Sequence, residues 1–247
     1  MNVLLTGAAG YAGRGIAATL ASAHRVRSLD IREAPAAAES LVGDIADLDV
    51  CRAALAGMDA VVLCHMAPNP TGYATPTLAI DVNVKGTANL YHLGVKLGIT
   101  RFVLISSTGV LRKALLATAM PGEGPYNFAH GLYVLTKIMQ EDLARFYFEA
   151  HGVRTTILRP AWIVYDEDFT TKYGQKLDFY DGGLIDPRDI GVAVGSALAL
   201  ADPTLEAIDI GQDDSNLDLA AARARLAWRP QHRFAGLPRK PRDASAA

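Results

Sequence analysis

The sequence has few cysteines, little net charge and no long hydrophobic run. Its 247 residues include two cysteines, Cys51 and Cys64, and neither stands in a C-x-x-C or other metal-ligand spacing. This predicts free thiols in a reducing, cytoplasmic compartment and no metal site. The formal net charge is -2, so no overall field favours nucleic acid or an anionic membrane as a partner. The N-terminus lacks the basic segment and apolar core of a signal peptide, and no apolar run is long enough to span a bilayer.

The composition is that of a globular protein, and short β-rich runs alternate with longer helical patterns. This alternation predicts a parallel sheet with crossover helices. We expect strands at residues 3–6, 25–29, 40–42, 60–63, 101–106, 155–159 and 207–210, and helices at 11–23, 47–55, 77–97, 132–151, 189–201 and 217–226. Residues 166–181 have no clear period and predict a loop near the substrate.

A glycine-rich turn follows the first expected strand and precedes the first expected helix. Glycines stand at 7, 10 and 13. Gly7 would allow a sharp turn out of the strand, Gly10 a close approach to a pyrophosphate, and Gly13 close packing of helix on sheet. The helix N-terminus would then present free N–H groups to the phosphates. The alternative is a structural turn, but this position in the chain favours nucleotide binding.

Asp30 ends the second expected strand, about twenty residues after the glycine turn. A carboxylate there accepts the hydroxyls of an adenosine ribose and repels a 2′-phosphate, which favours NAD over NADP. Arg32 is an opposing feature, because a nearby arginine accommodates that phosphate. Asp44 follows the third strand, and its carboxylate would accept a hydrogen bond from the adenine amino group. The alternative is that Asp44 only forms an Asx turn.

Two polar residues four positions apart, Tyr133 and Lys137, would share one face of a helix. An ammonium beside a phenol stabilises phenolate, and lowering the tyrosine pKa from about 10 to 7 requires ~4 kcal/mol. Ser106, Ser107 and Thr108 follow the fifth strand at the carboxyl edge, where ligands of open α/β sheets bind. A hydroxyl there would hold a substrate oxygen beside the phenol.

Several motifs follow one another in the order found in the extended short-chain dehydrogenases, the NAD-dependent epimerase/dehydratase proteins, which the chain resembles over most of its length. They are Thr6-Gly-Ala-Ala-Gly-Tyr-Ala-Gly13, Asp30, Gly43-Asp44, Asn83-Val-Lys-Gly-Thr87, Ser106-Ser107, Tyr133…Lys137, Leu158-Arg-Pro160 and Leu226-Ala-Trp-Arg-Pro230. Within the family, the short chain and the residues around the site are most similar to uronate dehydrogenases.

The resemblance implies a Rossmann-type doubly wound parallel sheet with a small C-terminal substrate-binding portion. Residues 1–160 would form the NAD-binding domain, 161–230 the substrate-binding portion interleaved with it, and 231–247 a flexible tail. A homodimer is expected, through the two long helices.

The resemblance also implies the site residues. Tyr133 would be the acid/base, Lys137 would bind the nicotinamide ribose and tune Tyr133, and Ser107 would position the reacting oxygen. Asn83 would have a structural or proton-relay role, or would simply bond backbone. The residues expected at the cofactor are Gly7, Gly10, Tyr11, Ala12, Gly13, Asp30, Ile31, Asp44, Ile45, Asn83, Tyr133, Lys137, Pro160 and Ile163.

The substrate side departs from the uronate dehydrogenase pattern. Thr108 and Trp162 stand where those enzymes have asparagine and serine, and their loop arginine has no obvious counterpart, although Lys172 and Lys176 lie nearby. We assign Thr108, His65 and Trp162 to the substrate. His65 is alternatively a packed, neutral histidine, and aromatic residues of the loop would favour a more apolar substrate.

The expected activity is hydride transfer between free NAD and a secondary alcohol or carbonyl of a sugar, sugar acid or polyol. An epimerase or dehydratase that recycles NAD internally is the alternative. Two features count against it: the segment after Pro160 is short, and Thr108-Gly109 lacks the acidic residue a dehydratase needs. A non-enzymatic dinucleotide sensor is a third possibility, but such proteins typically lose the tyrosine or lysine that this chain keeps.

Overall fold

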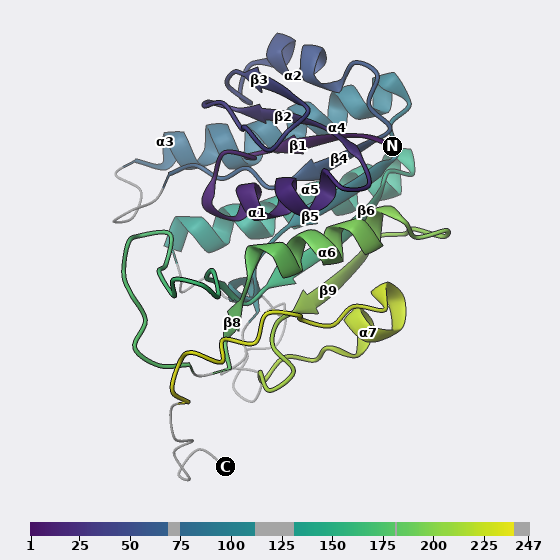
Figure 1. Ribbon diagram of the computed structural model, residues 1–247. Helices are drawn as coiled ribbons and strands as arrows, with labels where there is room; N and C mark the ends of the chain where they lie inside the picture. Colours follow the sequence, from purple (N-terminus) through teal and green to yellow (C-terminus); the bar gives the residue numbers. More distant parts are fainter. Residues whose placement is uncertain (69–74, 112–130, 181, 240–247) are drawn as a thin grey trace.

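The computed structural model describes residues 1–68, 75–111, 131–180 and 182–239. Seven parallel strands form the main sheet in the order β3-β2-β1-β4-β5-β6-β9 (Figure 1). Their bounds are β1 Asn2–Thr6, β2 Arg25–Asp30, β3 Glu39–Val42, β4 Ala60–Leu63, β5 Arg101–Ile105, β6 Arg154–Pro160 and β9 Glu206–Ile210. This order winds outward in both directions from β1 and confirms the predicted doubly wound α/β fold.

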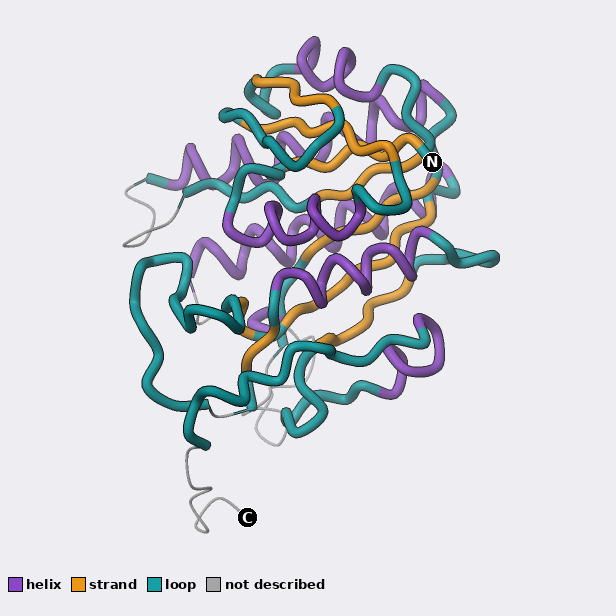
Figure 2. The backbone as a smooth tube through the Cα atoms, viewed as in Figure 1, coloured by secondary structure: helices purple, strands orange, loops and turns teal. Residues whose placement is uncertain are grey.

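The sheet is covered by helices on both faces (Figures 1 and 2). Along β1, Val3 and Leu5 belong to the core under α1 (Tyr11–Leu20) and α6 (Pro187–Leu198), whereas Leu4 belongs to the opposite core. That second core lies under α2 (Leu48–Leu55), α4 (Gly86–Leu97) and α5 (Gly131–His151). Burial on both faces explains why the central strands are almost entirely apolar.

The helix expected at 77–97 is interrupted in the structure. It consists of α3 (Pro76–Ala79), a π-helical turn η1 (Ile80–Lys85) and α4. The first helix also ends earlier than expected, at Leu20. A wider turn depends on tertiary contacts of individual residues, so hydrophobic periodicity does not reveal it.

The chain beyond Pro160 packs onto the main sheet and its helices. Strand β9 joins the main sheet, α6 packs on α1, and α7 (Ala220–Leu226) packs against β9 and α6. The two short strands β7 (Trp162–Ile163) and β8 (Leu184–Ile185) form a separate parallel pair. They were not expected, because two residues are too few to show a strand period.

Residues 231–239, the first part of the expected flexible tail, are packed in the structure. Phe234 is fully buried and Leu237 is 7% exposed, and both belong to an apolar cluster with Val164, Tyr180 and Leu184. Residues 231–239 are therefore packed against the protein, because the apolar side chains that stand between the basic residues are buried in this cluster. The remainder of the expected tail, 240–247, lies outside the described residues.

None of the helices in the described ranges combines the length and the apolar character needed to cross a membrane.

Candidate active site

A cavity of about 730 Å³ follows the carboxyl edge of the sheet, from the glycine turn to α5. It is lined by most of the expected cofactor residues and by one expected substrate residue: Gly7, Gly10, Tyr11, Ala12, Gly13, Asp30, Ile31, Asp44, Ile45, Tyr133, Lys137 and Ile163, and His65. Residues far apart in the sequence thus meet along one surface, in the place where open α/β sheets bind ligands.

Five expected residues do not line this cavity. Asn83 is fully buried in η1, where its Oδ1 accepts the Ala67 amide at 2.7 Å and its Nδ2 donates to Thr136 Oγ1 at 2.9 Å. This arrangement fits the structural role that the sequence left open for Asn83. The others are Pro160 at the buried end of β6, the half-exposed Trp162 in β7, and Ser107 and Thr108 at the turn after β5.

The glycine turn has the backbone geometry that a phosphate site needs. Gly7 has φ +70°, in the left-handed region, and a Cβ on Gly13 would lie 2.0 Å from the Gly7 carbonyl oxygen. Gly10 precedes the first turn of α1, which no side chain caps and which contains no acidic residue. The N–H groups and the positive end of the helix dipole therefore face the cavity, and the first turn of α1 itself has no acidic residue.

The Asp30 carboxylate is held at the end of β2 by backbone amides. Its oxygens accept from Ala9 N at 3.0 Å and from Arg32 N at 3.2 Å. The Arg32 guanidinium donates to the Ala9 carbonyl at 3.3 Å. Asp44 forms the Asx turn considered above, since its Oδ1 accepts Ala46 N at 2.9 Å, and it also lines the cavity.

Tyr133 and Lys137 lie one turn apart on α5, at the end of the cavity away from the glycine turn. Lys137 is 4% exposed, and its Nζ donates to the Ile105 carbonyl at 2.8 Å. Burial lowers the Lys137 pKa to about 8, and the Lys172 ammonium adds to this, whereas Cys64 and Glu141 act in the opposite direction. The ammonium form thus still predominates at neutral pH, beside the phenol.

The two serines after β5 have different partners. Ser106 is 3% exposed and donates to Glu141 Oε1 at 2.6 Å. Ser107 is half-buried and caps the short 3₁₀-helix η2 (Thr108–Val110) by accepting Gly109 N at 3.1 Å. The Ser106 hydroxyl donates to Glu141, but Ser106 lines the cavity and Ser107 does not, so the catalytic role of Ser107 stays a prediction.

His65 is 5% exposed and bonded through both ring nitrogens. Nδ1 lies 2.8 Å from Thr6 Oγ1, and Nε2 lies 3.0 Å from Thr87 Oγ1. Burial, together with the nearby Lys137 ammonium, lowers the His65 pKa to about 3, so the ring is neutral. This geometry favours the packed, neutral histidine, because a ligand would meet only the carbon edge of the ring.

In the sequence analysis Lys172 is a nearby cation without an assigned role. In the structure it lines the cavity. Its Nζ lies 5.6 Å from the Tyr133 ring centroid and 4.8 Å from that of Tyr173. The loop that carries it is fastened to the glycine turn, because the Tyr11 hydroxyl donates to the Thr170 carbonyl and accepts Tyr165 N at 3.1 Å.

Further lining residues lie outside the expected set, and three of them follow β4. Cys64, Met66 and Pro68 follow β4 at the carboxyl edge. The rule that ligands bind at this edge gives a signal that would have found them.

A family model described as the NAD dependent epimerase/dehydratase family matches residues 3–175. The chain belongs to this family. NAD is the cofactor in the family's name, and the lining of the cavity fits it, since the glycine turn, the uncapped start of α1 and the fixed Asp30 carboxylate are in place.

Among members and relatives, 3 beta-hydroxysteroid dehydrogenase/Delta 5-->4-isomerase of Mycobacterium tuberculosis is 34% identical over 173 residues, 66% of this chain and 47% of its own length. The chain thus spans about half the length of this relative. L-arabinose 1-dehydrogenase (NAD(P)(+)) of Haloferax volcanii is 27% identical over 248 residues, which cover 93% of this chain and 96% of that protein.

The uronate dehydrogenase structure from Agrobacterium tumefaciens, and that of a mutant of it complexed with NAD, superpose with a TM-score of 0.77. They are 22% identical and cover 98% of this chain and 92% of theirs. At this identity the likeness shows the fold.

Proposed function

We propose that the chain is an NAD-dependent oxidoreductase that interconverts a secondary alcohol and a carbonyl in a sugar, sugar acid or polyol, with free NAD as co-substrate. One observation carries the proposal: a single cavity has a phosphate turn and Asp30 at one end, and Tyr133 with Lys137 at the other. This arrangement supports the proposal, because a proton acceptor would then lie near the reactive end of the dinucleotide.

In this proposal the first turn of α1 holds the pyrophosphate, and Asp30 binds the adenosine ribose. Lys137 and Tyr133 lie at the nicotinamide ribose. NAD, when bound, supplies the acceptor for the hydride of the substrate C–H bond. Arg32 bonds to backbone beside Asp30, so the carboxylate remains the group at the ribose hydroxyls, which supports NAD over NADP.

The chain's own part of the reaction is proton transfer and positioning. The Tyr133 phenolate takes the proton of the substrate hydroxyl, so that the oxygen becomes a carbonyl oxygen as the C–H electron pair leaves the carbon. The Lys137 ammonium stabilises that phenolate, and Ser107 donates a hydrogen bond to the reacting oxygen.

The charge at the substrate end supports a sugar acid. Lys172 places an ammonium near the face of the Tyr133 ring, and Tyr173 flanks the same ammonium. A carboxylate or phosphate on the substrate would pair with this exposed ammonium. The aromatic residues Trp162, Tyr165, Phe169 and Tyr173 are not lining residues of the cavity, so an apolar roof has less support.

The alternative is an epimerase in which NAD is reduced and reoxidised within one turnover, as the family name allows. Measuring NADH formed by the pure protein with uronic acids, aldoses, polyols and a 3β-hydroxysteroid, with NAD or NADP, tests both. Accumulation of NADH with one class supports the dehydrogenase. Isomerised sugar without NADH would assign the epimerase instead.

We also infer a homodimer through α4 and α5. The helices pack against each other, and Leu97 and Phe146 expose 49% and 55% of their surface. A cytoplasmic location and a domain limit at residue 160 stay predictions from the sequence.

A further inference from the structure

A third polar side chain continues the Tyr133–Lys137 stripe on α5. Glu141 lies one helical turn beyond Lys137, on the same face, and is 3% exposed. A carboxylate is costly to bury without partners. The proposed reaction does not use Glu141, so its burial beside the site calls for a reason.

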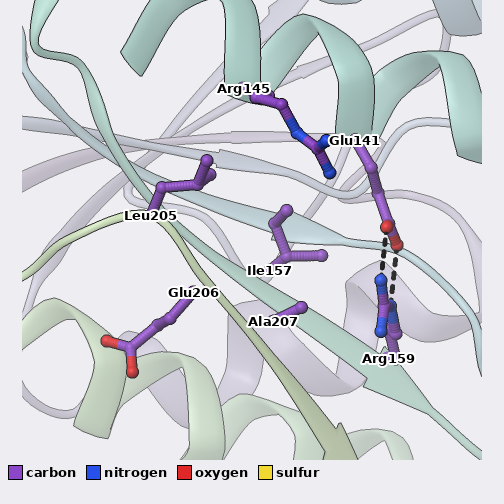
Figure 3. Close-up of a pocket in the computed structure, with 7 residues that line it drawn as sticks. All are labelled: Glu141, Arg145, Ile157, Arg159, Leu205, Glu206 and Ala207. Carbon is purple, nitrogen blue, oxygen red and sulfur yellow. Dashed lines mark hydrogen bonds and ion pairs between the residues drawn. The ribbon is translucent and has the colours of Figure 1, made fainter. Parts of the chain in front are cut away.

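The partners of Glu141 come from two strands that end at the site. Arg159 of β6 forms a bidentate ion pair with it: Nε donates to Oε1 at 2.9 Å and Nη2 to Oε2 at 2.6 Å. The Arg159 side chain is 15% exposed. Ser106, directly after β5, donates to the same Oε1 at 2.6 Å. Figure 3 shows the ion pair at one side of a cavity of about 190 Å³, separate from the nucleotide cavity.

We propose that Glu141 is a positioning residue: held by Arg159, it fixes α5 against β5 and β6 beneath Lys137, and it engages Ser106 so that Ser107 is the hydroxyl left for the substrate. The inference rests on the proposed function, because it concerns how Lys137 and Ser107 are presented.

The serine part follows from hydrogen-bond capacity. A hydroxyl has one proton to donate, and Ser106 gives its proton to Glu141. Ser107 accepts the Gly109 amide, which leaves its own proton for another acceptor. One carboxylate thereby gives two adjacent serines different hydrogen-bonding roles.

The lysine part follows from charge. The groups that face the Lys137 ammonium are Cys64 and His65 after β4, Lys172 of the loop, and Tyr133 and Glu141 on α5. Of these, Glu141 carries a negative charge and is itself buried. Removing that charge takes away a group that raises the Lys137 pKa, so it disfavours the ammonium form of Lys137.

The test is Glu141→Gln, which retains an acceptor for Ser106 and removes the charge. The full-length protein is labelled with [ε-¹³C]lysine, and Lys137→Met identifies the Lys137 resonance. We expect the Lys137 titration midpoint to fall by about one pH unit in Glu141→Gln. Glu206→Gln is the matched control. Glu206 lines the same small cavity but points away from the Glu141–Arg159 pair (Figure 3). The substitution breaks the ion pair between Glu206 and Arg225. It should leave the midpoint unchanged.

An unchanged midpoint in folded Glu141→Gln would overturn the charge role. If that variant does not fold, Glu141→Gln combined with Arg159→Met removes both partners of the ion pair together. The Lys137 midpoint should again lie below that of the parent, because the lost carboxylate is a group that raises the Lys137 pKa. This measurement needs no substrate, so it stands or fails separately from the proposed activity.

The different roles of Ser106 and Ser107 are tested by comparing their alanine variants. With a turned-over substrate, Ser107→Ala should reduce kcat by about 100-fold, and Ser106→Ala by less than about ten-fold. Equal losses in both variants, or a larger loss in Ser106→Ala, would contradict the assignment.

Discussion

At the scale of single residues, the site depends on keeping a buried lysine charged. The Lys137 ammonium donates to the Ile105 carbonyl, and burial is the main cause that lowers its pKa to about 8. A charge held in such a place is useful to the phenol of Tyr133 and costly to the fold. Function and stability are therefore opposed at this position.

Lys137→Met should consequently abolish activity but stabilise the protein. The folded-state pKa lies below the ordinary value of 10.5, so the cost of charged Lys137 is fully present below pH 8 and disappears as pH rises towards 10.5. We expect the variant to be more stable by about 2–3 kcal/mol at pH 7. Thermal unfolding between pH 7 and 10.5 checks this: the advantage should shrink over that range, and a variant less stable at pH 7 would contradict it.

At the scale of elements, the substrate loop is attached to the nucleotide-binding turn. Tyr11, in the first turn of α1, meets Tyr165 edge-on with ring centroids 5.2 Å apart, and its hydroxyl bonds to the backbone of Tyr165 and Thr170. The loop carries Lys172 to Tyr133. The position of the substrate cation is thus coupled to the start of α1.

Tyr11→Phe tests this coupling, since it removes the hydroxyl and keeps the ring. We expect KM for an anionic substrate to rise by about ten-fold, corresponding to ~1.4 kcal/mol, with a smaller change in kcat. Initial rates at saturating NAD measure both constants. Lys172→Met should raise KM in the same way, and additivity of the two changes in a double variant would argue against the coupling.

Local spacing predicted much of the site. The glycine turn, Asp30 and the pair Tyr133 and Lys137 follow from strand–turn–helix order and helical periodicity, and the structure brings them to one cavity. The partner of Ser106, the contact of Lys172 with Tyr133 and the π-helical turn around Asn83 depend on residues distant in the chain. No pattern along one segment contains that information.

At the scale of the whole molecule, the end of the described chain is fastened to the start of α6. Asp189 is fully buried and accepts the Gln231 amide at 3.1 Å, the His232 amide at 3.1 Å and His232 Nδ1 at 3.0 Å. The following Phe234 enters the apolar cluster that also contains Tyr180. The substrate loop and the C-terminal segment thus share one small core.

Asp189→Asn should therefore loosen this core without altering the nucleotide cavity. An amide has one acceptor oxygen in place of two, so a buried N–H loses its partner, at a cost of about 2 kcal/mol. In a protein of this size that lowers Tm by roughly 4–8 °C. Calorimetry measures the change, and NAD affinity serves as the control. An unchanged Tm would show that the contacts do not stabilise the segment.

The central claim is that Tyr133 is the acid/base of an NAD-dependent oxidoreductase. The most direct measurement compares the parent and Tyr133→Phe in parallel, for NAD affinity and for NADH formed with the substrate that the parent oxidises. The account predicts similar NAD affinity and a loss of kcat of about 10²–10⁴ fold in the variant. NADH formation at the parental rate by Tyr133→Phe would contradict it.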